Sequence, residues 1–142
     1  MNDDFQSGAS GQGRKFEEIC NDILIEHGFE LHGNARIKRL GFEVDQVATS
    51  NSGTTYWFEF KGSWRPPRPG MQRTDTTKKG LCNALLAHVD EISHPKFIIM
   101  TSHLPKDNSS GDAMCSVAIN SGALFDLICV YDPTDVARLL RL

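Results

Sequence analysis

The chain has 142 residues, of which 39% are hydrophobic and 23% charged, and its net charge is −3. This length and composition favour one globular domain with a single core and argue against a second folded domain. No apolar run approaches the roughly 18 residues that a membrane helix needs, and the polar start "MNDDFQSGASGQG" is unlike a targeting peptide. We expect one domain over residues 1–142, with residues 1–9 flexible, in a soluble cytoplasmic protein without membrane contact.

The first predicted element is an amphipathic helix. Ser10 is a suitable N-cap, and Gly28 is a residue type that commonly ends helices. Apolar residues recur between them at helical spacing, namely Phe16, Ile19, Cys20, Ile23 and Leu24.

Three short strands are predicted next. The first covers Ala35–Leu40, and the other two are joined at "SNSG". Adjacent short strands favour an antiparallel meander. The following "WRPPRPGMQ" is predicted to be a loop, because proline lacks a backbone N–H and fits neither a helix interior nor a central strand.

A second helix is predicted before "SHP" at residues 93–95. Its apolar stripe, extended toward the helix start, passes through Lys78 and Thr74, so we expect these two side chains to point into the same cleft. The stripe consists of Leu81, Cys82, Leu85, Leu86 and Val89.

The remaining chain predicts a buried strand at "KFIIMTS", a capped short helix at "SSGDAMCSVAINSG" and a second buried strand at "DLICVYD". Asp132 and Pro133 supply an N-cap and a first-turn proline for a closing helix through Leu142. The predicted order is αβββαβαβα, an α/β fold with a central mixed sheet flanked by helices.

The four cysteines are widely spaced in apolar contexts and form no zinc or redox motif. We expect buried, reduced thiols at Cys20, Cys82, Cys115 and Cys129.

Polar residues gather on one face of the predicted hairpin. Because side chains alternate along a strand, Glu59 and Lys61 share a face. A turn centred on Ser52 sets Asp45 directly opposite Glu59, with Cβ atoms about 5 Å apart. This register requires an odd number of loop residues, such as three or five, since an even number throws Asp45 to the other face.

Two opposed carboxylates repel each other unless they are fully solvated or share a cation. Hard oxygen ligands suit Mg²⁺, which would neutralise the pair, activate a water molecule and polarise a phosphoryl oxygen. Lys61 would orient that water or stabilise the charge that develops on phosphorus. Glu17, at the edge of the first helix's apolar stripe, completes the acidic cluster if that helix packs over the hairpin; the adjacent Glu18 is the alternative.

The segments "GRKFEE", "FEVDQVA" and "YWFEFKGS" together resemble the PD-(D/E)XK, or restriction-endonuclease-like, nuclease superfamily. The resemblance spans nearly the whole chain and implies an αβββαβ core. It implies that Asp45 and Glu59 are metal ligands, that Phe60 contributes its backbone carbonyl, that Lys61 is the catalytic lysine and that Glu17 is an accessory acid. The proline of the superfamily's name is absent, since Val44 precedes Asp45.

A basic strip follows the E-x-K element. Residues 61–79 contain six basic residues and one acid, a local charge of +5 that suits a phosphate-binding groove, although a solvated loop has the same composition. The residues expected to contact nucleic acid are Arg65, Arg68, Arg73, Lys78 and Lys79.

The expected function is a magnesium-dependent DNA endonuclease, with Mn²⁺ as a substitute for Mg²⁺. It would be restriction-type or structure-specific, as in junction resolution or repair, and cleavage of both strands would make a homodimer plausible. A non-catalytic nucleic-acid-binding module on the same fold is the alternative, and the sequence does not decide between DNA and RNA.

Overall fold

The structure, a computed structural model, describes residues 15–90 and 94–142. The expected flexible leader over residues 1–9 and the expected N-cap Ser10 lie outside the described residues. A helix over residues 15–26, here called the first helix, comes first in the described chain. It is followed by β1 (Glu30–Ile37), β2 (Phe42–Thr49), β3 (Thr55–Lys61), the 3₁₀ helix η1 (Gly70–Gln72), α2 (Thr74–Val89), β4 (Lys96–Thr101), α3 (Ser110–Ser121), β5 (Asp126–Cys129), α4 (Pro133–Ala137) and the 3₁₀ helix η2 (Arg138–Arg141).

The five strands form one mixed sheet in the order β1-β2-β3-β4-β5. β1, β2 and β3 are antiparallel neighbours, as expected of a meander, whereas β3, β4 and β5 run parallel. Parallel neighbours need crossover connections, and α2 and α3 provide them. The predicted element order and the mixed α/β architecture are confirmed.

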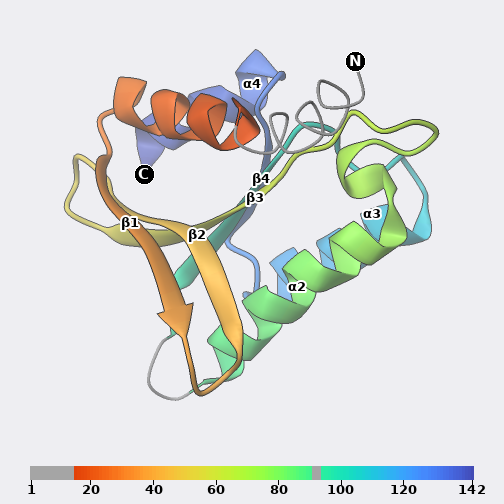
Figure 1. Ribbon diagram of the computed structural model, residues 1–142, viewed down its shortest axis with the longest axis horizontal. Helices are drawn as coiled ribbons and strands as arrows, with labels where there is room; N and C mark the ends of the chain where they lie inside the picture. The colour runs from red at the N-terminus through yellow and green to blue at the C-terminus, as the bar shows by residue number, and fades with distance from the viewer. Residues whose placement is uncertain (1–14, 91–93) are drawn as a thin grey trace, which may run out of the picture.

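Helices cover both faces of the sheet (Figure 1). The first helix and the C-terminal helices α4 and η2 lie on one face, and α2 and α3 lie on the other. Each face has its own buried cluster. The first contains Phe16, Leu24, Phe58 and Leu139, and the second contains Val44, Ala84, Phe97 and Cys115.

The first helix ends at Gly28, as predicted. Gly28 has a φ of +86°, the left-handed conformation that glycine adopts without a steric penalty. The amide of Phe29 donates to the carbonyl of Leu24 at 3.0 Å, and the amide of Gly28 donates to that of Ile25 at 3.0 Å. This pair of hydrogen bonds is the Schellman motif, which turns the chain directly into β1.

The predicted first strand was placed too late in the chain. β1 covers Glu30–Ile37, while the last residues of the predicted Ala35–Leu40 strand form the turn into β2, where the Gly41 amide donates to the Ile37 carbonyl at 2.9 Å. β1 is an edge strand in the described sheet, and its exposed positions are polar, so it lacks the apolar run that marks a buried strand.

The predicted buried stripe of α2 is only partly correct: Leu81 and Leu86 pack against the second cluster, and the other three residues do not. Leu85 and Val89 are 51% and 62% exposed, and Cys82 is exposed as well, so the expectation of a buried thiol there also fails. The helix instead faces the sheet with a row of small side chains, which lets the two backbones approach closely. The row consists of Thr77, Gly80, Ala84 and Ala87.

The chain's last segment is helical, but only its beginning is an α-helix. Asp132 caps α4, its side chain accepting a hydrogen bond from the Thr134 amide, and Pro133 occupies the first turn, both as predicted. The residues after Ala137 tighten into the 3₁₀ helix η2, whereas one closing helix through Leu142 was expected. Within residues 15–90 and 94–142, none of the helices combines the length and the apolar composition that crossing a membrane requires.

Candidate functional site

The hairpin of β2 and β3 has the predicted register. Thr49 pairs with Thr55 and Gln46 pairs with Phe58, which is the pairing that a turn centred on Ser52 gives. Residues 50–54 form the loop, so its length is odd, as the site requires.

The two strands separate immediately beyond this ladder. The last pair of the ladder is Gln46 with Phe58. The next residue beyond it is Asp45 on β2 and Glu59 on β3. Asp45 does not continue the ladder; its carboxylate Oδ2 accepts a hydrogen bond from the Phe60 amide at 2.7 Å. The side chain of Asp45 therefore lies in the fork between β2 and β3.

An irregularity in the pairing of β1 with β2 lies beside Asp45. From Leu31–Ala48 to Gly33–Val47, β1 advances two residues and β2 one; from Gly33–Val47 to Ala35–Val44, β1 advances two and β2 three, a bulge in β2. The extra residue of a bulge changes the direction in which nearby side chains point. Simple alternation along β2 does not predict this change.

Glu59 is a buried carboxylate with one unpartnered oxygen. The residue is 3% exposed, and Asn83 Nδ2 donates to its Oε1 at 2.8 Å. Its Oε2 has no hydrogen-bond partner among the described residues. Lys61 Nζ lies 3.8 Å from Oε2, beyond hydrogen-bond distance, so this contact is an ion pair.

α2 passes close above this carboxylate because Gly80 has no side chain. A Cβ atom at this position would lie 3.0 Å from Ile99 Cδ1, 3.5 Å from Glu59 Oε2 and 3.6 Å from Lys61 Cε. The helix therefore forms one wall of the site and brings Asn83, one turn further along, to Glu59.

The first helix borders Asp45 on its own side of the sheet, at a hollow that neither Glu59 nor Lys61 lines. A hollow of about 100 Å³ is lined by Phe16, Glu17, Asp45, Phe60 and Gly62. Glu17 thus borders the hollow that Asp45 enters, whereas Glu18 is not part of this lining, although both are exposed. Of the two acids left open by the sequence, the geometry favours Glu17.

Both carboxylic acids have raised pKa values. Burial raises the pKa of Glu59 to about 6, against the opposing effects of Lys61 and of the Asn83 hydrogen bond, and Asp45 raises it further. Burial also raises the pKa of Asp45, although the Phe60 amide and Lys61 lower it. The charge of Glu43 raises the pKa of Asp45 as well. The charged forms of both acids are therefore only partly compensated by the protein.

A divalent cation fits this donor set. Mg²⁺ binds through one or two carboxylates and otherwise through water and phosphate oxygens. Asp45 and Glu59 provide two carboxylates, and the unpartnered Glu59 Oε2 is the kind of buried polar atom that a cation would satisfy. Within the described ranges, no group of three or more His, Cys, Asp or Glu side chains could hold a metal ion, so Glu17 does not join Asp45 and Glu59 in one ligand group.

The five predicted nucleic-acid contacts are all exposed. Lys78 and Thr74 were expected to point into the cleft with the apolar stripe of α2. Lys78 instead is exposed, and Thr74 is half-buried. In the described part of the chain, none of the five basic residues forms an ion pair, which leaves them available to an anionic partner: Arg65, Arg68, Arg73, Lys78 and Lys79.

Sequence reasoning missed two residues that shape the site. Asn83 holds Glu59, and the hydroxyl of Thr101 donates to the Lys61 carbonyl at 2.7 Å, which anchors the end of β3 to β4. The spacing of small residues on α2 was the available signal for Asn83, because it marks the helix face that approaches the sheet.

We expect replacement of Asn83 by alanine to raise the pKa of Glu59 above about 6, because the lost hydrogen bond favours the charged carboxylate. The side-chain carboxyl carbon of Glu59, followed by NMR across a pH series, reports this midpoint. Asn34→Ala is the matched control, since Asn34 donates to the exposed Glu43 instead. An unchanged Glu59 midpoint in Asn83→Ala would show that the hydrogen bond does not tune this acid.

Comparison with known proteins returned no match: no protein-family model, no curated protein and no solved structure resembles the chain. The function is therefore inferred from the residues and geometry of this chain alone.

Proposed function

We propose that this protein is a magnesium-dependent DNA endonuclease with the restriction-endonuclease-like PD-(D/E)XK fold. The observation that carries the proposal is the grouping of Asp45, Glu59 and Lys61 at the end of β3. Lys61 Nζ lies 3.8 Å from the buried, unpartnered Glu59 Oε2, and Asp45 accepts from the amide of the intervening Phe60. The charge of Asp45 raises the pKa of Glu59, and the charge of Lys61 lowers the pKa of both acids. The element order and the mixed sheet are consistent with an αβββαβ core.

Asp45 and Glu59 would hold the Mg²⁺ ion together with the backbone carbonyl of Phe60, and Mn²⁺ would substitute. The ion would neutralise the paired acids, activate water for attack on phosphorus and polarise the phosphoryl oxygen. Asn83 positions Glu59 by occupying Oε1, which leaves the buried Oε2 directed toward Lys61.

Lys61 would act on the reacting phosphate. Its ammonium group is partly buried and is held by the Glu59 ion pair close to where negative charge increases during hydrolysis. A fixed cation at that point stabilises the transition state more than the ground state. Glu17 would assist from the first helix, where it lines the hollow beside Asp45.

The exposed basic residues would bind the phosphate backbone, which positions DNA without reading its sequence. Restriction-type cleavage and structure-specific cleavage, as in junction resolution or repair, are both compatible with this arrangement. Cleavage of both strands requires two sites, so we propose a homodimer for that case.

Incubation of the protein with supercoiled plasmid and with a four-way DNA junction tests the proposal. We expect cleavage in Mg²⁺ or Mn²⁺ and none in EDTA, with 5′-phosphate and 3′-hydroxyl ends. Conversion of the plasmid to the linear form without a nicked intermediate would support a dimer. Accumulation of nicked circles would support a single site. Binding of DNA without cleavage in either metal would contradict the proposal and support a non-catalytic binding module.

A further inference from the structure

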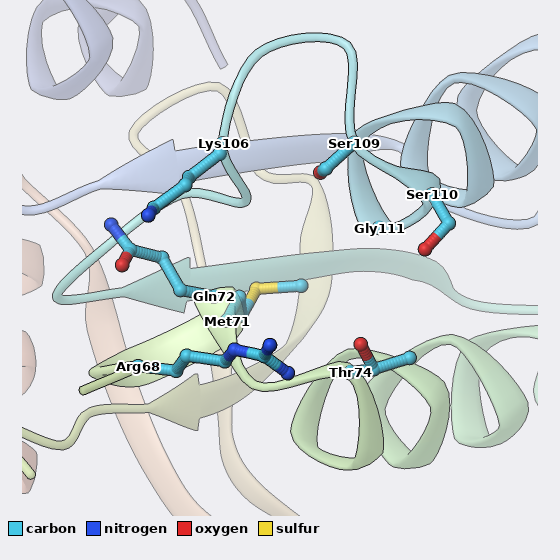
Figure 2. A pocket seen from close by; sticks show the side chains of 8 residues that line it. All are labelled: Arg68, Met71, Gln72, Thr74, Lys106, Ser109, Ser110 and Gly111. Atoms are coloured by element: carbon cyan, nitrogen blue, oxygen red, sulfur yellow. The ribbon is translucent and has the colours of Figure 1, made fainter. Parts of the chain in front are cut away.

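A second cavity, of about 260 Å³, lies at the carboxyl ends of β3 and β4 (Figure 2). Its walls come from the loop that follows β3, the start of α2, the loop that follows β4 and the start of α3. In α/β sheets, the crevice beyond the carboxyl ends of the strands is the usual place for a ligand. The site formed by Asp45, Glu59 and Lys61, here called the carboxylate site, lies at the neighbouring fork of β2 and β3. It shares no residue with the lining of this cavity.

The lining of this cavity is rich in hydrogen-bond donors and cationic side chains. Of the eight residues that line it, two are basic and none is acidic. Figure 2 shows Lys106 reaching in from the loop after β4 and Arg68 from the loop after β3, on opposite sides of the space. Neutral donors complete the lining, provided by Gln72, Thr74, Ser109 and Ser110.

Hydrogen bonds tie the two loops together. The Met71 amide donates to the His103 carbonyl at 3.0 Å, and the buried Thr77 hydroxyl donates to the Met71 carbonyl at 2.7 Å. Gly70, with a φ of +56°, permits this contact, because a Cβ atom there would lie 2.9 Å from Ser102 Oγ. The cavity is therefore preformed, which lowers the entropic cost of binding a ligand.

The helix starts add to the positive potential of the cavity. α2 has no side-chain cap, because Arg73 occupies its N-cap position, and Thr74 in its first turn lines the cavity. Ser109 caps α3 by accepting from the Asp112 amide, while Ser110 in the first turn of α3 also lines the cavity. Partial positive charge at a helix start favours an anion. Each first turn also holds one acid outside the lining of the cavity, Asp75 in α2 and Asp112 in α3, so the two cationic side chains supply most of the attraction.

We propose that this cavity binds a phosphate group of the nucleic-acid substrate, at a subsite separate from the carboxylate site. The inference rests on the proposed nuclease function. Along α2, Thr74 at the cavity and Gly80 at Glu59 are separated by a rise of about 9 Å, which corresponds to roughly two or three nucleotides of one strand. The cavity holds the strand a short distance from the phosphate that is cleaved.

The test compares two charge-matched double variants. Arg68→Ala/Lys106→Ala removes the two cations of the cavity. Arg36→Ala/Lys38→Ala removes one arginine and one lysine that are exposed on the edge strand β1 and the turn after it, two strands away from β3. Both variants change net charge equally, so a difference between them isolates the cavity.

The first measurement uses inorganic phosphate as the probe. We expect phosphate to shift the backbone amide NMR signals of Ser110 and Gly111 in the wild type and in the control variant, and not in the cavity variant. The second measures DNA affinity by fluorescence anisotropy in EDTA, where cleavage does not interfere. Relative to the control, the cavity variant should bind more weakly, with a slope of log affinity against log salt that is smaller by about 1.

The source of the phosphate is distinguished with oligonucleotides that carry a 5′-phosphate or a 5′-hydroxyl. If the cavity variant loses affinity equally for both oligonucleotides, relative to the control variant, the cavity binds an internal phosphodiester. If it loses affinity only for the oligonucleotide with a 5′-phosphate, the cavity binds a strand end. The inference is overturned if phosphate leaves both amides unshifted and if the cavity and control variants bind DNA equally. Phosphate and DNA binding at the cavity without any cleavage by the wild type would overturn the nuclease proposal and leave the subsite standing.

Discussion

Replacement of Lys61 by alanine is expected to reduce the single-turnover rate of DNA cleavage by about 10²–10³-fold while DNA affinity changes little. The ammonium group lies 3.8 Å from Glu59 Oε2, at the fork that also holds Asp45, so its charge acts on the reacting phosphate and not on the DNA backbone at large. The measurement is cleavage of a labelled duplex or junction with enzyme in excess, together with anisotropy in EDTA.

Two further variants make this result specific. Asp45→Asn should lose cleavage to at least the same degree, because it removes the charge that a divalent cation needs while the amide side chain keeps an oxygen for the Phe60 N–H. Lys38→Ala, at an exposed lysine in the turn before β2, should cleave like the wild type. Cleavage retained by both Lys61→Ala and Asp45→Asn would remove these residues from the catalytic site.

Replacement of Glu59 by glutamine is expected to abolish cleavage and, in the absence of metal, to stabilise the fold. Burial raises the pKa of Glu59 from 4.5 to about 6, so the folded protein holds this proton more tightly than the unfolded chain does. Stability therefore falls as pH rises from 4.5 through 6, and above that range the charged carboxylate costs the folded state about 2 kcal/mol. A neutral glutamine avoids this cost.

Urea unfolding in EDTA at two pH values measures the effect. At pH 7.5 the free energy of unfolding should be higher for Glu59→Gln than for the wild type, and at pH 4, where Glu59 is protonated, the difference should vanish. Mg²⁺ should stabilise the wild type and not the variant, since it binds the charged site in the folded state. Glu26→Gln, at an exposed glutamate of the first helix, is the matched control. A variant less stable than the wild type at pH 7.5 would mean that the charge of Glu59 is well compensated by the protein alone.

The hairpin illustrates what the sequence determines. Alternation along β2 and β3 and the position of the "SNSG" turn were sufficient to predict the pairing of Thr49 with Thr55 and of Gln46 with Phe58. These are local features, because a strand's period of two and the parity of the loop fix which side chains share a face. The same local reasoning led from the hairpin to Asp45, Glu59 and Lys61.

α2 illustrates what local reasoning misses. The large residues Leu85 and Val89 suggested the buried face, yet the helix packs through small residues and leaves both exposed. Which face of α2 is buried depends on how closely the helix approaches β3 at Gly80, and this approach is a property of the assembled sheet. The contact of Asn83 with Glu59, and the loss of Lys78 from the predicted cleft, both follow from that packing.

The bulge in β2 is a second non-local feature. It depends on how β2 pairs with β1, and it directs Asp45 into the fork, where the carboxylate accepts the Phe60 amide instead of facing Glu59 across a regular ladder. Sequence alternation predicted the register of the hairpin, and the strand pairing set the orientation of Asp45.

The central claim is that Asp45 and Glu59 together hold one divalent cation. Anomalous scattering from crystals of the wild-type protein soaked in Mn²⁺ tests it most directly, because the signal locates the metal without requiring activity. We predict one Mn²⁺ ion bound by the carboxylates of both Asp45 and Glu59, and its loss in crystals of Glu59→Gln. Crystals in which no Mn²⁺ binds, or in which it binds without contact to either carboxylate, would contradict the claim.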